Sequence, residues 1–471
     1  MGNKLKRWLT GLLLGVVALS AVAEGPAAWT YSAKPWNQWI LGAQLKPTFN
    51  LNLAAIAAGN YDPLTFTRAS SGTMFDSTGT LVTKSTNVAR VDYDPATLVL
   101  RGLLIEEART NLLVYSEQFN DASWAKTDTT ITANSIAAPD GTTTADLFTE
   151  GSAGTASVVQ GVTGTANANF AISRFFKIGN TDWVEMHLAD GSSTVRQWYN
   201  LNTRAVGSNV VSGTGVFVSA SVQQLPNGWL RATLVGSLGG GTTAISATTI
   251  SASADGSTTR VANSTRYEWG AQFENNVSFA TSYIPTTTAA VTRAADLASI
   301  TGANFTSFWN ATQGTIVAGW NIPAFLSSAF PVIFTADDNT ANNAIYLNSR
   351  GSTPNPRAEV SVGGVAQATL NASGIVAGVN VKTAFAYAAN DFSLSAQGAA
   401  VVTDTSGTIP TVDRAFIGSD RGISQFLNGW ISSLSYYPVA VDAVTLTQLA
   451  SDTMPTFAAN DDVFWLTASA R

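Results

Sequence analysis

The clearest pattern in the chain is a short alternation of apolar and polar residues. Within the segment 183–188, every second residue is apolar, and these are Val184, Met186 and Leu188. The residues between them are Trp183, Glu185 and His187. Because successive side chains of a strand point to opposite faces of its sheet, this segment predicts a strand with one buried face and one outward face.

Similar patterns recur along most of the chain, bounded by Gly, Asn and Pro. Residues 222–225 and 229–235 flank Pro226-Asn227-Gly228, which predicts a hairpin because Asn and Gly accept the positive φ angles of tight turns. Further strands are expected around 267–273, 315–320, 414–418 and 430–437. Only Val441–Ser451 has helical spacing of its apolar residues. The sequence therefore predicts an all-β chain built from two antiparallel β-sandwiches.

Changes in composition suggest where the domains begin and end. A Thr/Ala-rich stretch, 286–295, separates two strand-rich blocks and is typical of a linker, while 61–113 is richer in Arg, Asp and Glu. The expected segments are 1–23 (signal-like apolar segment), 24–60 (N-terminal docking segment), 61–113 (small module), 114–285 (first sandwich), 286–295 (linker), 296–455 (second sandwich) and 456–471 (C-terminal tail). No heptads are present, so no coiled coil is predicted.

The first 23 residues have the features of an export signal. The basic start consists of Lys4, Lys6 and Arg7. An uncharged, mostly apolar run follows over Leu9–Val22, and Ala21-Val22-Ala23 forms a cleavage pattern before Glu24. The run spans roughly 20 Å as a helix, short of the ~30 Å hydrocarbon core. We expect either a cleaved signal peptide or a retained apolar helix.

The docking segment 24–60 begins with a cluster of aromatic residues. These are Trp29, Tyr31, Trp36 and Trp39. Exposed aromatic side chains are costly in a terminal segment. The cluster therefore indicates docking onto a partner or a neighbouring subunit, or packing against the chain's own first domain.

Composition and charge exclude several functions. Charged residues make up 12% of the 471 residues and the net charge is −6, so a nucleic-acid partner is not expected. The chain has no Cys, which excludes disulfides, thiolate metal sites and cysteine nucleophiles. Its one histidine, His187, excludes multi-histidine metal sites and limits any Ser-His-Asp triad to a single imidazole.

Motifs along the chain resemble three known kinds of domain. A module common in tailed-phage and prophage virion proteins is similar to Phe66–Thr73, Asp92–Pro95 and Arg101–Leu112. A jelly-roll domain like a carbohydrate-binding module resembles Ser116–Phe119, Ala138–Thr143, Asn227–Trp229, Trp269–Glu274 and Ser282–Thr286. A laminin-G or concanavalin A-like sandwich is similar, at the level of fold, to Ile417–Ser419, Leu427–Ile431 and Tyr436–Pro438.

The resemblance implies a jelly roll followed by a concanavalin A-like sandwich behind a small N-terminal module. It also implies a phage tail fibre, spike or other surface appendage that touches host glycans. A signal-like segment is unusual in a virion protein, and this departure leaves the docking mode and the compartment open.

The candidate glycan-binding residues lie on the outward face of the alternating strand. They are Trp183, Glu185, His187 and, on a nearby strand with Arg196 and Asn200 beside it, Trp198. Aromatic faces fit the C–H face of a pyranose, and carboxylates and amides bind its hydroxyls. The alternative is that this face meets another sheet or subunit.

Catalytic residues are not expected. The chain has no G-x-S-x-G nucleophile elbow to work with His187. Glu106 and Glu107 are adjacent, so they point to opposite faces of a strand and cannot act as paired carboxylates. We expect Glu106 and Arg109 to form a structural ion pair instead. The glycine run 238–241 lacks the lysine of a phosphate-binding loop.

One turn resembles an oxygen-rich calcium loop. It consists of Asp337, Asp338 and Asn339. Two acids and an amide are too few for the roughly 6–8 oxygen ligands that calcium takes, and the same residues are common in ordinary turns. Apart from calcium at this turn, the sequence predicts no cofactor.

The sequence and its resemblance together predict a non-enzymatic virion surface protein that binds host glycans and, through its N-terminal segment, other virion proteins. We expect a homo-oligomer, a trimer by analogy. The alternatives are a structural capsid-decoration or appendage-stem protein, a secreted or periplasmic bacterial lectin cleaved before Glu24, and a polysaccharide depolymerase.

Overall fold

The computed structural model describes residues 45–152, 155–239, 244–323, 330–350, 355–373 and 376–451. The chain divides into two compact units, 1–46 and 47–471, and the helices and strands of the described residues lie in the second. The signal-like segment 1–23, the aromatic cluster of the docking segment and the tail 456–471 lie outside the described residues. Within the described ranges, no helix has the length and apolar character needed to cross a membrane.

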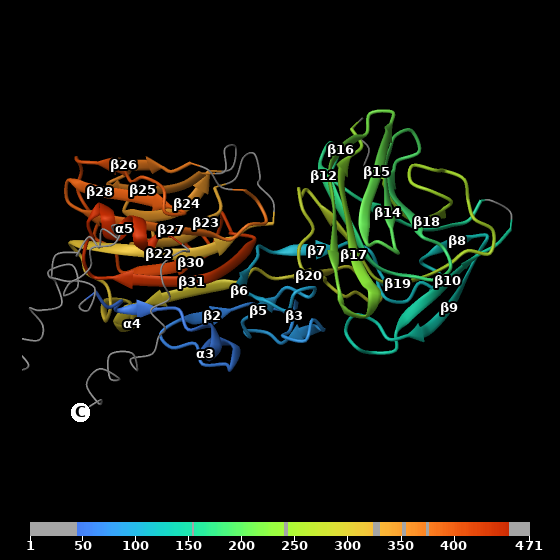
Figure 1. Cartoon of the computed structure of the whole chain (residues 1–471), viewed down its shortest axis with the longest axis horizontal. Coiled ribbons are helices and arrows are strands. Elements are labelled where there is room, and N and C mark those ends of the chain that lie inside the picture. Colours follow the sequence, from blue (N-terminus) through green and yellow to red (C-terminus); the bar gives the residue numbers. More distant parts are fainter. Residues whose placement is uncertain are drawn as a thin grey trace, which may run out of the picture. The chain divides into compact units, whose positions relative to one another are not determined.

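The first sandwich consists of two six-stranded antiparallel sheets (Figure 1). One sheet has the order β15-β14-β13-β18-β11-β8, with β8 (Ala125–Thr127), β11 (Ser157–Thr163), β13 (Trp183–Ala189), β14 (Thr194–Asn200), β15 (Ala205–Ser212) and β18 (Ala244–Ala252). The other has the order β16-β17-β12-β19-β10-β9, with β9 (Thr129–Ile136), β10 (Ala145–Glu150), β12 (Asn169–Ile178), β16 (Val216–Gln224), β17 (Trp229–Ser237) and β19 (Thr265–Asn275).

The core of this sandwich confirms the predicted alternation. Val184, Met186 and Leu188 are completely buried and belong to one apolar cluster with side chains of the opposite sheet, such as Phe273. Burying an aliphatic side chain contributes roughly 1.5–3 kcal/mol, so this face fixes which side of β13 points inward.

The predicted hairpin is also confirmed. Strands β16 and β17 pair in antiparallel fashion across Pro226–Gly228. The turn places Asn227 at φ 57° and Gly228 at φ 77°, the left-handed region that these two residue types tolerate best.

The second sandwich has an eight-stranded and a seven-stranded sheet. In the first, β1 (Phe49–Asn50) lies beside β31, and the order is β29 (Val402–Asp404), β28 (Asp391–Ala396), β27 (Val381–Ala388), β22 (Gln313–Asn321), β31 (Gly429–Tyr437), β6 (Leu100–Ile105) and β5 (Val91–Tyr93). In the second, the order is β2 (Thr65–Thr67), β21 (Leu297–Thr301), β30 (Arg414–Ile417), β23 (Val332–Asp337), β24 (Ala344–Arg350), β25 (Asn355–Val362) and β26 (Val365–Asn371).

Short elements complete the fold. In the part of the chain that the structure describes, the α-helices are α3 (Leu53–Ala57), α4 (Gly302–Thr306) and α5 (Ala443–Leu449), of which α5 lies within the predicted helix. Two small two-stranded sheets pair β3 (Gly72–Phe75) with β4 (Leu81–Lys84) as a hairpin, and β20 (Val291–Arg293) with the sequence-distant β7 (Arg109–Asn111).

Two predicted boundaries need correction. The segment 61–113 does not stand apart, because Leu103 of β6 pairs with Ile431 of β31 and Phe66 of β2 pairs with Ala298 of β21. The stretch 286–295 contains β20 and is not only a linker. Leu103 is fully buried in the core of the second sandwich, so this segment is needed to close that core.

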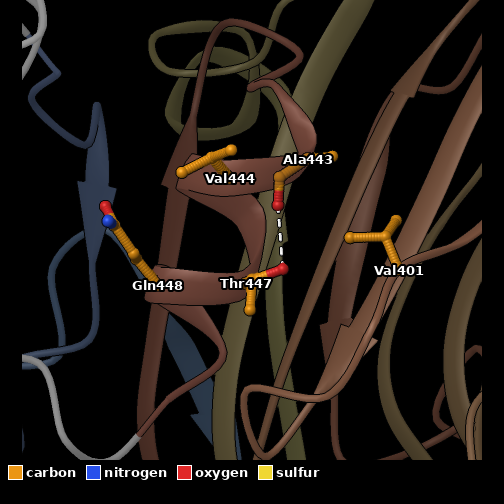
Figure 2. A pocket seen from close by; sticks show the side chains of 5 residues that line it. All are labelled: Val401, Ala443, Val444, Thr447 and Gln448. Carbon is orange, nitrogen blue, oxygen red and sulfur yellow. Dashed lines mark hydrogen bonds between the residues drawn. The ribbon is translucent and has the colours of Figure 1, made fainter.

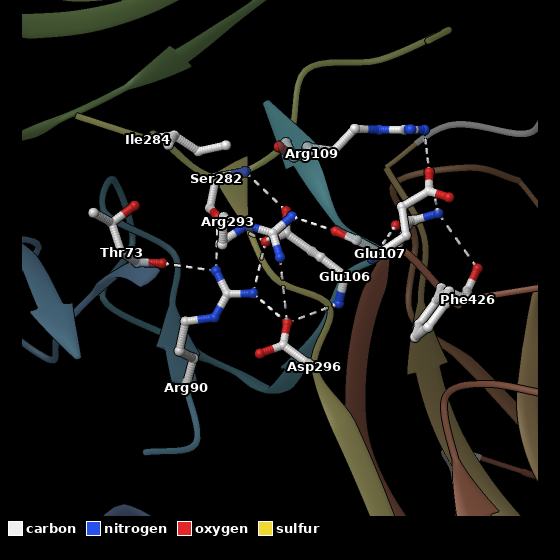
Figure 3. Close-up of polar contacts among 12 residues, drawn as sticks. Thr73, Arg90, Glu106, Glu107, Arg109, Ser282, Ile284, Arg293, Asp296 and Phe426 are labelled. Atoms are coloured by element: carbon white, nitrogen blue, oxygen red, sulfur yellow. Dashed lines mark hydrogen bonds and ion pairs between the residues drawn. The ribbon is translucent and has the colours of Figure 1, made fainter. Parts of the chain in front are cut away.

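The charge-rich composition of 61–113 is explained by a buried ionic network (Figure 3). Asp296 accepts hydrogen bonds from Arg68, Arg90 and the backbone N–H of Glu106. Glu106 in turn pairs with Arg90 at 2.7 Å and with Arg293 at 3.5 Å. All five side chains are almost completely buried. The network joins strands of the second sandwich to the segment around β20.

The predicted pair of Glu106 with Arg109 is wrong. Arg109 pairs with Glu107, while Glu106 faces the opposite way into the network. Burial by itself raises the pKa of Glu106, but the charges of Arg293 and Arg90 outweigh that effect and hold the pKa at about 2. Glu106 is therefore ionised at neutral pH.

We expect Asp296→Asn to destabilise the fold by about 3–5 kcal/mol, because it leaves buried arginines without their counter-charge. Urea denaturation measures the loss. The control is Glu359→Gln, which breaks a partly exposed pair with Arg357 and should cost less than about 1 kcal/mol. Equal effects of the two substitutions would show that the buried network does not hold the fold together.

Candidate functional site

The candidate site lies on the outer face of the sheet that contains β13, the face turned away from the core of the first sandwich. Since Val184, Met186 and Leu188 point inward, Trp183, Glu185 and His187 point outward. In the register between β13 and β14, Glu185 lies opposite Trp198 and His187 lies opposite Arg196. The predicted residues are therefore brought together on one face.

Glu185 is the centre of this face. Its carboxylate contacts His187 Nδ1 at 2.7 Å, Arg196 Nη1 at 2.7 Å and Arg260 Nη1 at 3.3 Å. Its side chain is fully buried. Burial acts to raise the pKa of Glu185, but the hydrogen bond and charge of His187 and the charges of both arginines lower it below its ordinary value. We call these four residues the Glu185 cluster.

The side chains that contact Glu185 remain accessible, unlike Glu185 itself. The side chains of Arg196, Arg260 and His187 are 25%, 14% and 10% exposed. Each arginine has five N–H donors. Among the described residues, each guanidinium donates one hydrogen bond, from Nη1 to the carboxylate of Glu185. The remaining N–H groups are free to bind a ligand.

A segment between β18 and β19, residues 253–264, lies over part of this face. Its Arg260 joins the cluster, and its Asp255 accepts hydrogen bonds from the N–H and Oγ of Ser208 on β15. The carbonyl of Ser257 accepts a hydrogen bond from Trp198 Nε1 at 2.9 Å. We call residues 253–264 the outer loop.

The prediction that Trp198 binds a glycan is wrong, because the outer loop covers this residue. Trp198 is fully buried, so its ring has no open face for a sugar, and its indole N–H is already bonded to Ser257. Trp198 is therefore a structural residue that holds the outer loop on the sheet.

Trp183 is the aromatic residue of the cluster face that stays partly exposed. Its ring lies close to Gly207 of β15, where a Cβ atom would come within 2.6 Å of the indole. Glycine at position 207 thus lets β15 and Trp183 approach each other. The exposed part of the ring lies on the same face as the accessible cations.

Sequence analysis did not identify Arg260. It is 75 residues from Glu185 in the chain, and no local pattern links the two. Arg196 could have been predicted from the sequence, because it lies two positions from Trp198 on the same strand and therefore faces the same side of the sheet.

In the turn predicted to resemble a calcium loop, both carboxylates accept hydrogen bonds from neighbouring residues of the turn. Asp337 accepts from the N–H of Asn339, and Asp338 accepts from Thr340 and from Asn343 Nδ2. Among the described residues, no group of three or more His, Cys, Asp or Glu side chains is placed to hold a metal ion. We do not propose calcium at this turn.

A shallow apolar depression beside α5 is a weaker candidate (Figure 2). It is lined by Val401, Ala443, Val444, Thr447 and Gln448. Thr447 Oγ1 donates within the helix to the carbonyl of Ala443. The depression has neither an aromatic ring nor a charged group to bind a sugar.

Comparisons with known proteins give no assignment of function. No family model matches the chain, and no curated protein matches it. Among solved structures, a Ruminococcus gnavus IT-sialidase CBM40 bound to α2,3-sialyllactose is 16% identical, with 30% of this chain and 84% of that chain covered and a TM-score of 0.27. A leech intramolecular trans-sialidase is 20% identical, with 32% and 25% covered and a TM-score of 0.28.

A third similar structure is chicken galectin 2, which is 11% identical, with 27% of this chain and 96% of that chain covered and a TM-score of 0.19. The β-sandwich architecture is assigned from the strand order of the chain itself.

Asp337 gives the fold a measurable pH dependence. Burial raises the pKa of Asp337 to about 6, against the opposing effects of the Asn339 N–H and Arg414. The folded state therefore holds this proton more tightly than the unfolded state, whose pKa is about 3.9. The resulting stabilisation is present below about pH 4 and is lost as the pH rises through about 6.

In urea denaturation between pH 3 and 7, Asp337→Asn should lose less stability than the native chain as the pH rises. The control, Asp338→Asn, should lose more stability than the native chain as the pH rises, because hydrogen bonds from Thr340 and Asn343 lower the pKa of the partly exposed Asp338. If Asp337→Asn follows the native profile, Asp337 is not protonated as described.

Proposed function

We propose that the chain is a non-enzymatic glycan-binding protein on the surface of a tailed-phage virion, and that it attaches to host glycans through the outer face of the first sandwich. One observation carries the proposal. A partly exposed Trp183, two accessible guanidinium groups and the imidazole of His187 lie on one sheet face, around the buried Glu185. Within the described residues, this combination of an aromatic ring and convergent donors fits a sugar best.

The chemistry of the face supports binding over catalysis. The aromatic ring offers an apolar surface for the C–H groups of a sugar ring, and the guanidinium groups donate to its oxygens. The Nδ1 atom of His187 is hydrogen-bonded to Glu185, as the base is to its orienting carboxylate in a triad, but no hydroxyl among the described residues is bonded to the imidazole to serve as the nucleophile.

The virion assignment is supported by the motifs at 66–73, 92–95 and 101–112, which resemble a module of tailed-phage proteins. A secreted or periplasmic lectin remains the second candidate, favoured by the signal-like segment 1–23. Intact-mass analysis of the native protein separates the two. A chain that begins at Met1 in the particle supports the virion protein, and a mature chain that begins at Glu24 supports the lectin.

We expect Trp183→Ala to weaken binding to host cells or to their purified surface polysaccharide on the order of tenfold, about 1.4 kcal/mol, because the stacking surface is lost. Cell adsorption and isothermal titration calorimetry measure the effect, and circular dichroism checks the fold. The matched control is Tyr437→Ala, a half-buried aromatic residue of β31 in the second sandwich. Unchanged adsorption by a folded Trp183→Ala variant would contradict the proposed site.

We also propose that the chain forms a homo-oligomer, a trimer, so that weak contacts act together. Support comes from β15 and β16, which are the edge strands of the two sheets of the first sandwich. The segment Ala205–Gln224 contains no charged residue and no proline, the usual devices that keep an edge strand from pairing. Its exposed aliphatic residues are Val206, Val210, Val211, Val216 and Val218.

Light scattering after size-exclusion chromatography should give three times the mass of one chain. Val210→Lys should lower that mass, because a lysine on the edge disfavours pairing. The control is Val365→Lys, at a position that is 62% exposed on the second sandwich. A monomeric native chain would rule out the homo-oligomer, and assembly that Val210→Lys does not disturb would rule out this edge.

A further inference from the structure

The Glu185 cluster has more positive than negative charge. It contains one carboxylate and two guanidinium groups, and the carboxylate is fully buried while the guanidinium groups are partly exposed. A ligand that approaches this face therefore meets the cations and not the anion. Another acid on this face, Asp255, is bonded to the N–H and Oγ of Ser208 at the β15 edge.

The cluster is rigidly built. Arg196 is held on β14, with its neighbours paired to β13 on one side and β15 on the other. Arg260 is held by its contact with Glu185 and by the outer loop, which Trp198 and Asp255 fasten to the sheet. Side chains that are already ordered lose little conformational entropy when a ligand binds.

A neutral sugar is expected to bind such a site weakly. Its hydroxyls accept hydrogen bonds but leave the second guanidinium charge without a counter-charge. A carboxylate or sulfate supplies that charge, and its oxygens match the planar fork of a guanidinium with two parallel hydrogen bonds.

From these observations we infer that the outer face of the first sandwich selects anionic glycans, with the acidic group of the sugar bound by Arg196 and Arg260 and a sugar ring placed against Trp183. This inference rests on the proposed function, since it names the class of glycan bound at the same site.

The experiment uses the full chain and matched pairs of saccharides that differ in charge. The probes are sialyllactose with lactose, a hyaluronan hexasaccharide with chitohexaose, and a sulfated with an unsulfated N-acetyllactosamine. Calorimetry or biolayer interferometry at fixed salt gives the affinity for each member. We expect at least one charged member to bind roughly tenfold or more tightly than its neutral counterpart, the scale of one charge-assisted interaction.

Three variants test the residues. Arg196→Gln and Arg260→Gln should each remove about tenfold of the affinity for the charged member, while binding of the neutral member changes little. Each variant leaves Glu185 with one arginine and His187 as partners, and thermal melting confirms that the variants fold. The matched control, Arg357→Gln, removes a partly exposed arginine paired with Glu359 on the second sandwich and should bind as the native chain does.

The outcomes separate the inference from the proposed function. Equal affinity for charged and neutral members, lost in Trp183→Ala, overturns the anionic selectivity and keeps the glycan-binding face. Charge-selective binding that Arg196→Gln and Arg260→Gln leave unchanged overturns the assignment to this cluster. A chain that binds no member of any pair overturns both.

Discussion

The register of β13 between β14 and β18 is the constraint on which the site depends. Strand side chains alternate between faces, so a slip of one residue would exchange the buried and outward sets. The burial of Val184, Met186 and Leu188 opposes that slip with several apolar side chains at once. The same register places His187 opposite Arg196 and Glu185 opposite Trp198. The core thus positions the charged cluster without any of its members entering the core.

A buried charge has different consequences in the two parts of the chain. In the network around Asp296, anions and cations are all enclosed, and the result is a junction that joins segments distant in sequence. In the Glu185 cluster, only the anion is enclosed. The cations at its rim keep unused donors, so the same kind of interaction leaves a surface that can bind a ligand.

The sequence predicted the local features of this fold well. Alternation identified β13 and its inward face, and the Asn227-Gly228 turn identified the β16–β17 hairpin. Partners distant in sequence were not predictable, because nothing near Leu103 indicates that it pairs with Ile431. For the same reason Arg260 was missed, and Trp198 was placed on an open face that the outer loop covers. Each of these errors comes from tertiary contacts and not from the pattern of the strand concerned.

The central claim is that the outer face of the first sandwich binds a sugar. A crystal structure of the full chain with its tightest-binding saccharide tests it most directly. We predict a sugar ring against Trp183, with an acidic group within hydrogen-bond distance of Arg196 or Arg260. A saccharide bound on the second sandwich, with the Glu185 cluster unoccupied, would contradict it.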